Sequence, residues 1–598
     1  MAFRFLTFCI IFSSIQLSSL NGQLVIDTIE VHDLFSIQQA SNVIYINQKE
    51  RTGTEALKNI SSLQVQQSAL GGLQTILYRG MSSRHISLLW NGINIQSPIN
   101  GVFDISLIPF ESFDDTRLYT SSTNTSAGVN AIAGTINLKS NASKKEKSIT
   151  VRLSTLSNYD VNAKTYWVTK KSVHHITAAL SHQDNAYNYT LGKARLKRQN
   201  TDFNLANITY TGEAILSKNS ILKGEIWYQT ANRSIPTSIV AAPIDQRQND
   251  QNTRLNLSFQ QYFNHYRWQN SASFLDENLD YFSPGIISIS NNQVWNVNSA
   301  LTPKLKHDRS LGLNYRKDII QANFYTANLV RNTLSVSGFR QMEWSRDRKL
   351  QLNARQDIVD SKMMPTSVSV TYSHGNNSIN FNRNYQLPTF NDLYWPEGGN
   401  PDLQTELSHQ GEISKNFKLR GIDFKSSAYI NHVNNWIQWT PTNSGVWQPF
   451  NYKSVLARGI ELQALINKKF KSSELSFKFD YSYSPTTNLA QLSINIGKGK
   501  QLIYTPLHKS SLNIDYQNQK LKGGLEAIMT SKRYDTTDNS TYLPTYLLLN
   551  ATVGYNLDPI SIRLDIYNLT DTDYAIVRFF PQAGLNTRLS IKYVINKY

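Results

Sequence analysis

The most constraining feature of this chain is a series of long segments in which apolar and polar residues alternate. They recur from about residue 147 to the C-terminus. Because successive side chains of a β-strand point to opposite faces, each segment has one apolar and one polar face. The alternation therefore predicts many two-faced strands. The apolar face takes every second position: Leu475, Phe477, Phe479, Tyr481 and Tyr483, then Leu512, Ile514 and Tyr516, then Leu547, Leu549, Ala551, Val553, Tyr555 and Leu557, and finally Leu585, Leu589, Ile591 and Tyr593, with Thr587 interrupting the last run.

A soluble sandwich shows the same alternation, and three observations favour a membrane barrel instead. The segments run about ten residues, whereas strands of soluble proteins are usually about five or six. Tyr, Phe and Trp gather near the segment ends, as in the aromatic girdles of outer-membrane barrels. Only 40% of the 598 residues are hydrophobic and the mean hydropathy is −0.39, too low for a soluble core of this size. Such a barrel must close, because an open edge in lipid leaves backbone groups unpaired.

The same pattern sets the size of the barrel and the domain order. At roughly 20 residues per strand and connection, the segment from residue 147 to 598 predicts about 22 antiparallel strands. So wide a lumen is normally filled, and the shorter, glycine-punctuated segment 24–140 predicts a compact α+β domain inside it. We expect a signal peptide at 1–23, an N-terminal extension at 24–40, a plug at 41–143 and an all-β barrel at 144–598. A helical membrane protein is excluded, because no later stretch approaches about 18 apolar residues.

The N-terminus is typical of an exported protein. Arg4 precedes an apolar run from Phe5 to about Leu20, and a cleavage region is expected around Asn21 to Gln23. The only cysteine, Cys9, lies in this segment, so the exported chain has no disulfide and no thiol chemistry. The net charge of +17 is scattered along the chain. It suits anionic lipid and lipopolysaccharide, or a merely solvating surface, better than nucleic acid.

Four stretches resemble the TonB-dependent outer-membrane receptors, and together they extend over nearly the whole mature chain. The family's "RG…R…DG" plug signature is matched at residues 78–93, with Asn91 where the family usually has Asp. The second stretch is 103–109, and the third, 128–138, resembles the end of the plug. The fourth is distributed over the barrel at 387–394, 399–403, 457–462 and 568–574. The resemblance implies a plugged barrel of about 22 strands in the bacterial outer membrane that imports a scarce small chelate.

Several plug residues then acquire an expected structural role. Arg79 and Arg84 are expected to form ion pairs with Asp or Glu of the barrel wall, since a guanidinium fork suits bidentate pairing. The glycines are expected to serve turns with positive φ or close backbone approach. They are Gly80, Gly92, Gly128 and Gly134.

The segment just after the signal peptide resembles the TonB box of the family. Its residues are Asp27, Thr28, Ile29, Glu30 and Val31. A short extended segment offers unpaired backbone groups to which a partner's strand can add. The resemblance implies TonB of the TonB–ExbB–ExbD complex as partner and proton-motive force as energy source. The alternative is an ordinary first strand of the plug.

The substrate is less constrained. The chain looks most like the vitamin B12 (cobalamin) receptor subgroup, with ferric-siderophore receptors as the alternative. Haem is disfavoured, because no His lies between Pro388 and Asn400. No cofactor, metal or catalytic residue is expected. A passive porin or adhesin remains an alternative, and a surface lipoprotein at the mouth is a possible further partner. Candidate substrate contacts are Gln67, Leu70, Asn94 and Gln96 at the plug apices, and Trp395 and Trp447 in loops.

Overall fold

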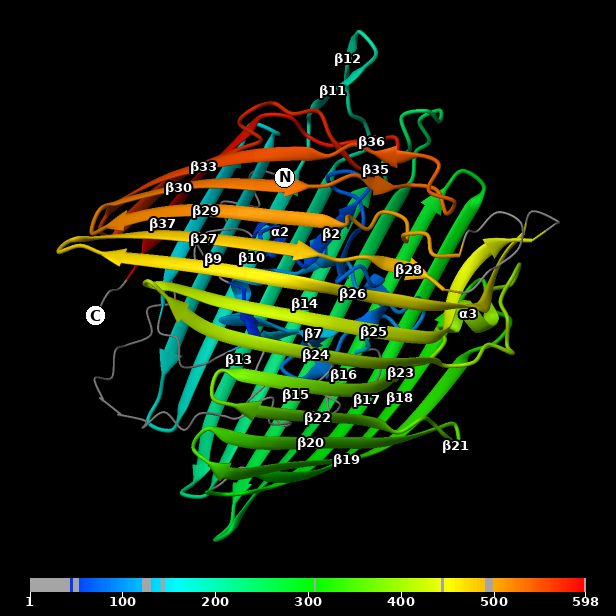
Figure 1. The fold of residues 1–598 in the computed structure, drawn as a ribbon, viewed down its shortest axis with the longest axis vertical. Coiled ribbons are helices and arrows are strands. Elements are labelled where there is room, and N and C mark those ends of the chain that lie inside the picture. The colour runs from blue at the N-terminus through cyan, green and yellow to red at the C-terminus, as the bar shows by residue number, and fades with distance from the viewer. Residues whose placement is uncertain are drawn as a thin grey trace.

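A computed structural model of the protein describes residues 43–46, 53–120, 131–140, 146–305, 308–442, 446–489 and 498–595. The expected signal peptide, the expected TonB box at Asp27–Val31 and Gly128 lie outside these ranges. Within them, 22 long strands form a closed antiparallel barrel (Figure 1). The last strand closes it by pairing with the first, with Leu589 opposite Leu153. The predicted fold class and strand number are confirmed.

The barrel strands have these bounds: β8 (Ser148–Ser154), β9 (Asn158–Val168), β10 (Ser172–Gln183), β13 (Phe203–Ser217), β14 (Ser220–Ser234), β15 (Arg247–Tyr262), β16 (Tyr266–Ser283), β17 (Ile286–Pro303), β18 (Arg309–Ala322), β19 (Leu329–Ser345), β20 (Arg348–Val359), β22 (Ser367–His374), β23 (Asn377–Gln386), β24 (Glu406–Leu419), β25 (Ile422–Pro441), β26 (Trp447–Lys469), β27 (Ser473–Tyr483), β29 (His508–Asn518), β30 (Leu521–Thr530), β33 (Tyr546–Leu557), β34 (Ile560–Tyr567) and β37 (Asn586–Val594).

The side chains of these strands alternate as the sequence predicts, and the apolar face points outward, as a membrane barrel requires. In β27, Phe479 and Tyr483 are each 38% exposed on the outside, whereas Asp480 and Ser482 point inward and are buried. The inward residues are buried because a second domain fills the lumen. The barrel is therefore apolar toward lipid and polar toward its contents.

The domain inside the barrel is built around a five-stranded mixed sheet of order β1-β6-β7-β4-β5. A separate hairpin, β2–β3, and the helix α2 pack beside it. The plug elements are β1 (Val43–Tyr45), α2 (Gly53–Lys58), β2 (Leu63–Gln67), β3 (Gln74–Tyr78), η1 (Ser83–His85), β4 (Ile86–Trp90), β5 (Ile93–Asn94), η2 (Ile105–Leu107), η3 (Phe110–Ser112), β6 (Asp115–Tyr119) and β7 (Gly134–Lys139).

The plug has its own apolar core, to which Leu57, Leu63, Trp90, Leu118 and Ile136 contribute. The same cluster continues into inward-facing apolar residues of the wall, among them Trp227, Val433 and Trp436, so the plug also packs on the barrel through apolar contacts. Within the described ranges, no helix combines the length and apolar content needed to cross a membrane.

The two ends of the barrel differ in their connections. One end carries short turns, such as the one between β13 and β14, and we call it the short-turn end. The other end, called the long-loop end, carries longer connections with their own small elements. These are β11 (Asn188–Leu191), β12 (Ala194–Lys197), β21 (Lys362–Met363), α3 (Phe390–Tyr394), β28 (Thr486–Asn488), β31 (Arg533–Tyr534), β32 (Tyr542–Leu543), β35 (Ala575–Val577) and β36 (Phe580–Pro581).

The turn between β2 and β3 places an apex of the plug at the long-loop end. Gln67 Nε2 donates to Gln582 Oε1 at 2.6 Å, and Gln582 lies in the connection after β36. Gly71 has a φ of +82°, and a Cβ there would lie 2.3 Å from the carbonyl oxygen of Thr201. Only glycine allows this close approach of the apex to a barrel loop.

Candidate functional site

A tight turn after β3 directs Arg79 of the plug at the barrel wall. Arg79 and Gly80 both have positive φ, 52° and 71°. A Cβ on Gly80 would lie 2.0 Å from Oγ1 of Thr486, so glycine is required for this turn to fit against β28. The close approach carries the guanidinium group beyond the plug surface and into the lumenal face of the barrel.

Arg79 is bound there by two carboxylates from the strands on either side of β25. Its Nη1 lies 2.9 Å from Glu412 of β24, and its Nε and Nη2 each donate at 2.8 Å to Glu461 of β26. The ring of Tyr429, on β25 between them, lies 4.1 Å from the guanidinium carbon. We call Arg79, Glu412, Glu461 and Tyr429 the Arg79 clamp. The side chain of Arg79 is 3% exposed.

The acidic partners of Arg79 stabilise its charged form and offset the unfavourable effect of burial. Burial alone lowers the pKa of a guanidinium, but the charges of Glu412 and Glu461 outweigh it and raise the pKa of Arg79 well above its ordinary value. A buried cation with two bidentate partners is stable only in this one position. The clamp therefore sets how the plug sits in the barrel.

Two further plug residues bind the connection that contains α3. Arg84 Nη2 lies 2.5 Å from Asp392 of α3, and His85 Nε2 lies 2.7 Å from Glu406 at the start of β24. Asp392 also accepts from Nε1 of Trp439 at 2.9 Å and closes a capping box with Thr389. Arg79 thus forms ion pairs with the barrel wall as expected, whereas the acidic partner of Arg84 lies in α3, in a connection at the long-loop end and not in the wall.

The opposite wall uses polar contacts of the same kind. Arg233 of β14 lies 2.5 Å from Asp104 of the plug, next to η2. Asn91 Nδ2 donates to Glu225 of β14 at 2.6 Å, while its Oδ1 accepts from the backbone N–H of Ser140 at 2.9 Å. The amide at position 91, where the family usually has Asp, has a reason here: its partner is a carboxylate, to which a second carboxylate cannot donate.

Of the four glycines singled out in the sequence, the described ones, Gly80, Gly92 and Gly134, lie at a positive φ or a close backbone approach. Gly92 has a φ of +87° in the turn after β4. Gly134 begins β7, where a Cβ would lie 2.8 Å from the carbonyl oxygen of Tyr119. The first supports a turn, and the second supports close packing within the plug sheet.

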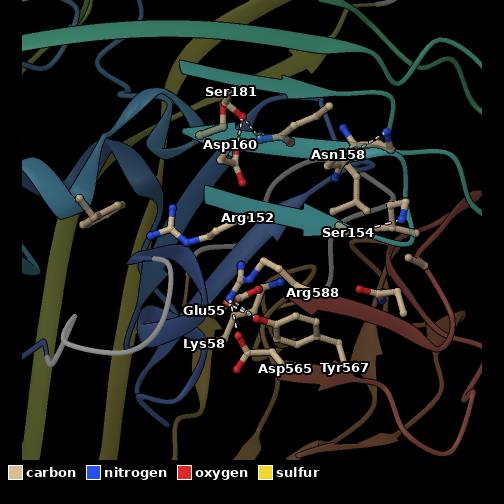
Figure 2. A pocket seen from close by; sticks show the side chains of 18 of the residues that line it. Glu55, Lys58, Arg152, Ser154, Asn158, Asp160, Ser181, Asp565, Tyr567 and Arg588 are labelled. Carbon is tan, nitrogen blue, oxygen red and sulfur yellow. Dashed lines mark hydrogen bonds and ion pairs between the residues drawn. The ribbon is translucent and has the colours of Figure 1, made fainter. Parts of the chain in front are cut away.

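A cavity of about 340 Å³ separates the plug from one part of the wall. It extends from Gln67 and Leu70 at the apex to Glu55 and Glu111 deeper in the lumen, beside strands β8–β10 and β33–β37. Figure 2 shows its lining of charged and hydroxyl side chains. We call this space the lumenal cavity. Its size is at the low end for ligand pockets, so a large chelate passes only if the plug moves.

The inner end of the lumenal cavity holds an ion cluster that attaches α2 to the wall. Glu55 accepts from Tyr567 Oη at 2.8 Å and from Arg588 Nη2 at 3.0 Å (Figure 2). Nearby, Lys509 Nζ donates to the carbonyl oxygens of Lys58, Ile60 and Leu63 at 2.8, 3.1 and 2.5 Å. These contacts fasten α2, the first helix of the plug in the described part of the chain, and the residues just after it.

The candidate substrate residues fall into different settings. Leu70 is half-buried and lines the lumenal cavity, as does Gln67, which is 2% exposed and bound to Gln582. Gln96 is 4% exposed, and its Nε2 donates to the carbonyl oxygens of Ile86 and Gly101. This geometry gives Gln96 a place within the plug rather than at a surface.

Asn94 ends plug strand β5 and faces barrel strand β18, whereas the two tryptophans belong to the long-loop end. The carbonyl oxygen of Asn94 accepts from Nη1 of Arg316 at 3.1 Å. Trp395 follows α3, with its ring 5.1 Å from that of Phe324. Trp447 is the first residue of β26 and not part of a loop, and it is 58% exposed. A Cβ on Gly398 would lie 2.2 Å from the carbonyl oxygen of Trp447, so the two tryptophan segments pack together.

Several residues of the site carried no identifiable signal in the sequence. Glu406, Glu412, Arg233, Lys509 and Arg588 are single charged residues in alternating strands, and their plug partners are 129 to 533 positions away. The one feature that they share in the sequence is a charged side chain on the polar, inward face of a predicted strand. In the described part of the chain, no group of three or more His, Cys, Asp or Glu is arranged to hold a metal ion.

Replacing Asn91 by Asp tests the contact with Glu225. The new carboxylate would face Glu225 without a proton to donate, and we expect plug docking to weaken by about 1–3 kcal/mol. The expected result is a lower midpoint of thermal unfolding and faster proteolysis of the plug. Asn91→Asp combined with Glu225→Gln restores a donor and is expected to recover most of the loss. Equal midpoints for wild type and Asn91→Asp would contradict this role.

The contact between Arg84 and Asp392 predicts a dependence on pH. Burial raises the pKa of Asp392, but Arg84 and the capping hydrogen bonds outweigh it, and the pKa lies below its ordinary value. The stabilisation is therefore complete above about pH 4 and is lost as the pH falls through the lowered pKa.

Pepsin cleavage of the connection 387–405 measures this dependence. We expect resistance at about pH 4.5 and increasing cleavage as the pH falls through the lowered pKa of Asp392. In Asp392→Asn, cleavage is expected already at the higher pH, whereas Asp538→Asn in an exposed loop serves as the control. An Asp392→Asn protein as resistant as wild type at the higher pH would show that this ion pair does not hold the connection.

Comparison with known proteins agrees with this architecture. Residues 109–569 match the family model "TonB dependent receptor-like, beta-barrel", and residues 35–135 match the "TonB-dependent Receptor Plug Domain". The chain is 25% identical over 543 residues to the "Vitamin B12 transporter BtuB" of Photobacterium profundum, covering 87% of this chain and 86% of that protein.

Solved structures share the fold at low sequence identity. The "Copper transporter OprC" superposes with a TM-score of 0.77 at 14% identity, covering 92% of this chain and 99% of that one. The FrpB iron transporter of Neisseria meningitidis gives 0.76 at 14% identity, with coverages of 93% and 100%. With both family models matched and the plug seated in a closed 22-strand barrel, the chain belongs to the TonB-dependent receptors of the bacterial outer membrane.

Proposed function

We propose that this TonB-dependent outer-membrane transporter imports cobalamin or a related corrinoid. The observation that carries the proposal is the 25% identity to a vitamin B12 transporter over 87% of the chain. A ferric siderophore is the second candidate, because solved siderophore receptors share the fold, among them PirA of Acinetobacter baumannii with a TM-score of 0.74.

Substrate would bind at the long-loop end, which faces the exterior in outer-membrane barrels. Leu70 at the plug apex, Asn94, and the segments of Trp395 and Trp447 are the proposed contacts. Indole rings suit a flat macrocycle or an aromatic chelate, because they add contact area at low conformational cost. No residue of this set supplies catalytic chemistry, in keeping with a carrier family.

Energy would enter through the TonB box proposed at Asp27–Val31. TonB, driven by the ExbB–ExbD complex, would add a strand to this segment and pull. The first described helix after it is α2, so its contacts with Tyr567, Arg588 and Lys509 are among the first to bear the load. Their release would widen the lumenal cavity, while the Arg79 clamp holds the rest of the plug in place.

Binding of cyanocobalamin to the purified protein in detergent tests the substrate proposal. We expect saturable quenching of tryptophan fluorescence, reduced in Trp395→Phe and Trp447→Phe. Trp268→Phe is the matched control, because Trp268 lies on the lipid-facing side of β16 and is 41% exposed. If the folded protein binds a ferric catecholate but not cyanocobalamin, the cobalamin proposal is wrong and a ferric siderophore becomes the favoured substrate.

Replacing Ile29 by Pro tests the proposed TonB box separately. Proline removes a backbone donor and blocks strand addition, so uptake is expected to fall at least about ten-fold while surface binding is retained. Ile29→Val keeps the backbone and is expected to transport normally. Unchanged uptake in Ile29→Pro would remove the coupling role of this segment and leave a passive porin or adhesin as the alternative.

A further inference from the structure

The connection between β10 and β13 contains an isolated hairpin that projects from the long-loop end of the barrel (Figure 1). Strands β11 and β12 pair Asn188 with Lys197, Tyr189 with Leu196, Thr190 with Arg195 and Leu191 with Ala194. Gly192 begins the two-residue turn with a φ of +62°, as a type II′ turn requires. The hairpin is thus an ordered element with a defined pairing.

Pairing separates the hairpin into two faces of different chemistry. Tyr189, Leu191, Ala194 and Leu196 share one face, and Leu191 and Leu196 are 45% and 39% exposed. The other face carries Arg195 and Lys197 beside Asn188 and Thr190, with Lys193 in the turn. All residues from 190 to 197 are exposed, and no Asp or Glu occurs between residues 187 and 200.

The base of the hairpin is fixed although its tip is free. Tyr187 Oη donates to the carbonyl oxygen of Pro581 at 2.9 Å, and Arg198 Nη2 donates to that of Thr237 at 2.5 Å. Asn200 Nδ2 donates to the carbonyl oxygen of Ile244 at 3.0 Å. These contacts with neighbouring loops therefore hold the hairpin in a defined position instead of letting it collapse onto the barrel.

The hairpin leaves strand edges open. In the described part of the chain its sheet has only two strands, so the outer edges of β11 and β12 have no neighbouring strand. A two-stranded hairpin is marginally stable alone, and open edges are sites for a further strand. The exposed lysines and arginine discourage pairing with a second copy of this hairpin, since like charges would meet, and they favour an acidic strand.

We propose that the β11–β12 hairpin is a docking site for an extended acidic segment of another protein at the cell surface, which adds to the hairpin as a third strand. Anionic lipopolysaccharide would pair only with the cationic side chains of the hairpin and would leave its backbone edge and apolar face unused. A polypeptide also uses the backbone edge and the apolar face. Exposed Val240, Ile244 and Phe579, in the loops that hold the hairpin base, offer further apolar surface to such a partner.

A labelled peptide tests this site on the full mature chain in lipid nanodiscs. The probe is a ten-residue peptide of alternating Val and Glu, and its binding is followed by fluorescence anisotropy. A peptide of equal charge with two central Val replaced by Pro is the control for strand addition. We expect the alternating peptide to bind and the proline peptide to bind at least about ten-fold more weakly.

Matched charge reversals locate the binding. Lys193→Glu, Arg195→Glu and Lys197→Glu together are expected to weaken binding at least about ten-fold. Lys170→Glu, Lys171→Glu and Lys471→Glu change the net charge equally in exposed turns at the short-turn end and are expected to leave binding unchanged. Leu191→Ser with Leu196→Ser tests the apolar face, and heat-dependent gel mobility verifies that each barrel is folded.

The results of these binding experiments distinguish an acidic protein partner from lipopolysaccharide. Binding lost only in the hairpin variants and only with proline supports an acidic protein partner. Equal binding of the proline peptide, or binding that survives charge reversal, overturns the proposal. If lipopolysaccharide vesicles bind through the same cations while the alternating peptide does not, the site is a lipid contact instead. None of these results depends on which chelate the barrel transports.

Discussion

The buried ion pairs between plug and wall are the interaction on which the rest of the structure depends. A barrel in lipid turns most of its apolar side chains outward, so its inner face is largely polar and offers a plug only a few apolar residues to pack on, among them Trp227, Val433 and Trp436. Arg79, held by Glu412 and Glu461 and covered by Tyr429, adds a directional polar attachment to these apolar contacts. Removing one partner of a buried pair costs about 3–5 kcal/mol, so the clamp defines one seat for the plug.

The distribution of these contacts has a functional consequence. The β3–β4 region is fixed by Arg79, Arg84 and His85, each buried or half-buried against an acidic residue of the barrel or its loops. The α2 region is fixed by the Glu55 cluster and by Lys509, and it borders the lumenal cavity. A plug attached through polar contacts can exchange them for water, which a plug packed through apolar surface cannot do without a larger cost. Polar attachment is therefore compatible with a domain that must both seal and move.

Much of the fold was predictable from the residues because its rules are local. Alternation at every second position gives the strands, and the number of residues gives the strand count. The family resemblance at residues 78–93 also directed attention to Arg79, Gly80 and Arg84, whose contacts the structure shows. Two of the acidic partners, Asp392 and Glu461, lie in barrel stretches that carry the same resemblance, but nothing local pairs them with a particular arginine. Gln96 looked like an apex residue, and its burial depends on the fold of the loop around it.

The sequence by itself determined that the chain is a closed membrane barrel with a folded domain inside, because lipid admits no open edge and a wide lumen must be filled. It also determined the residue types of the plug signature. Only the tertiary structure decided which charges meet, where the lumenal cavity lies and which loop segment projects as a hairpin. The physical reason is sequence distance: Arg79 and Glu461 are 382 positions apart, and Glu55 and Arg588 are 533 positions apart. Contacts of that separation arise from barrel closure and strand register, which no local pattern encodes.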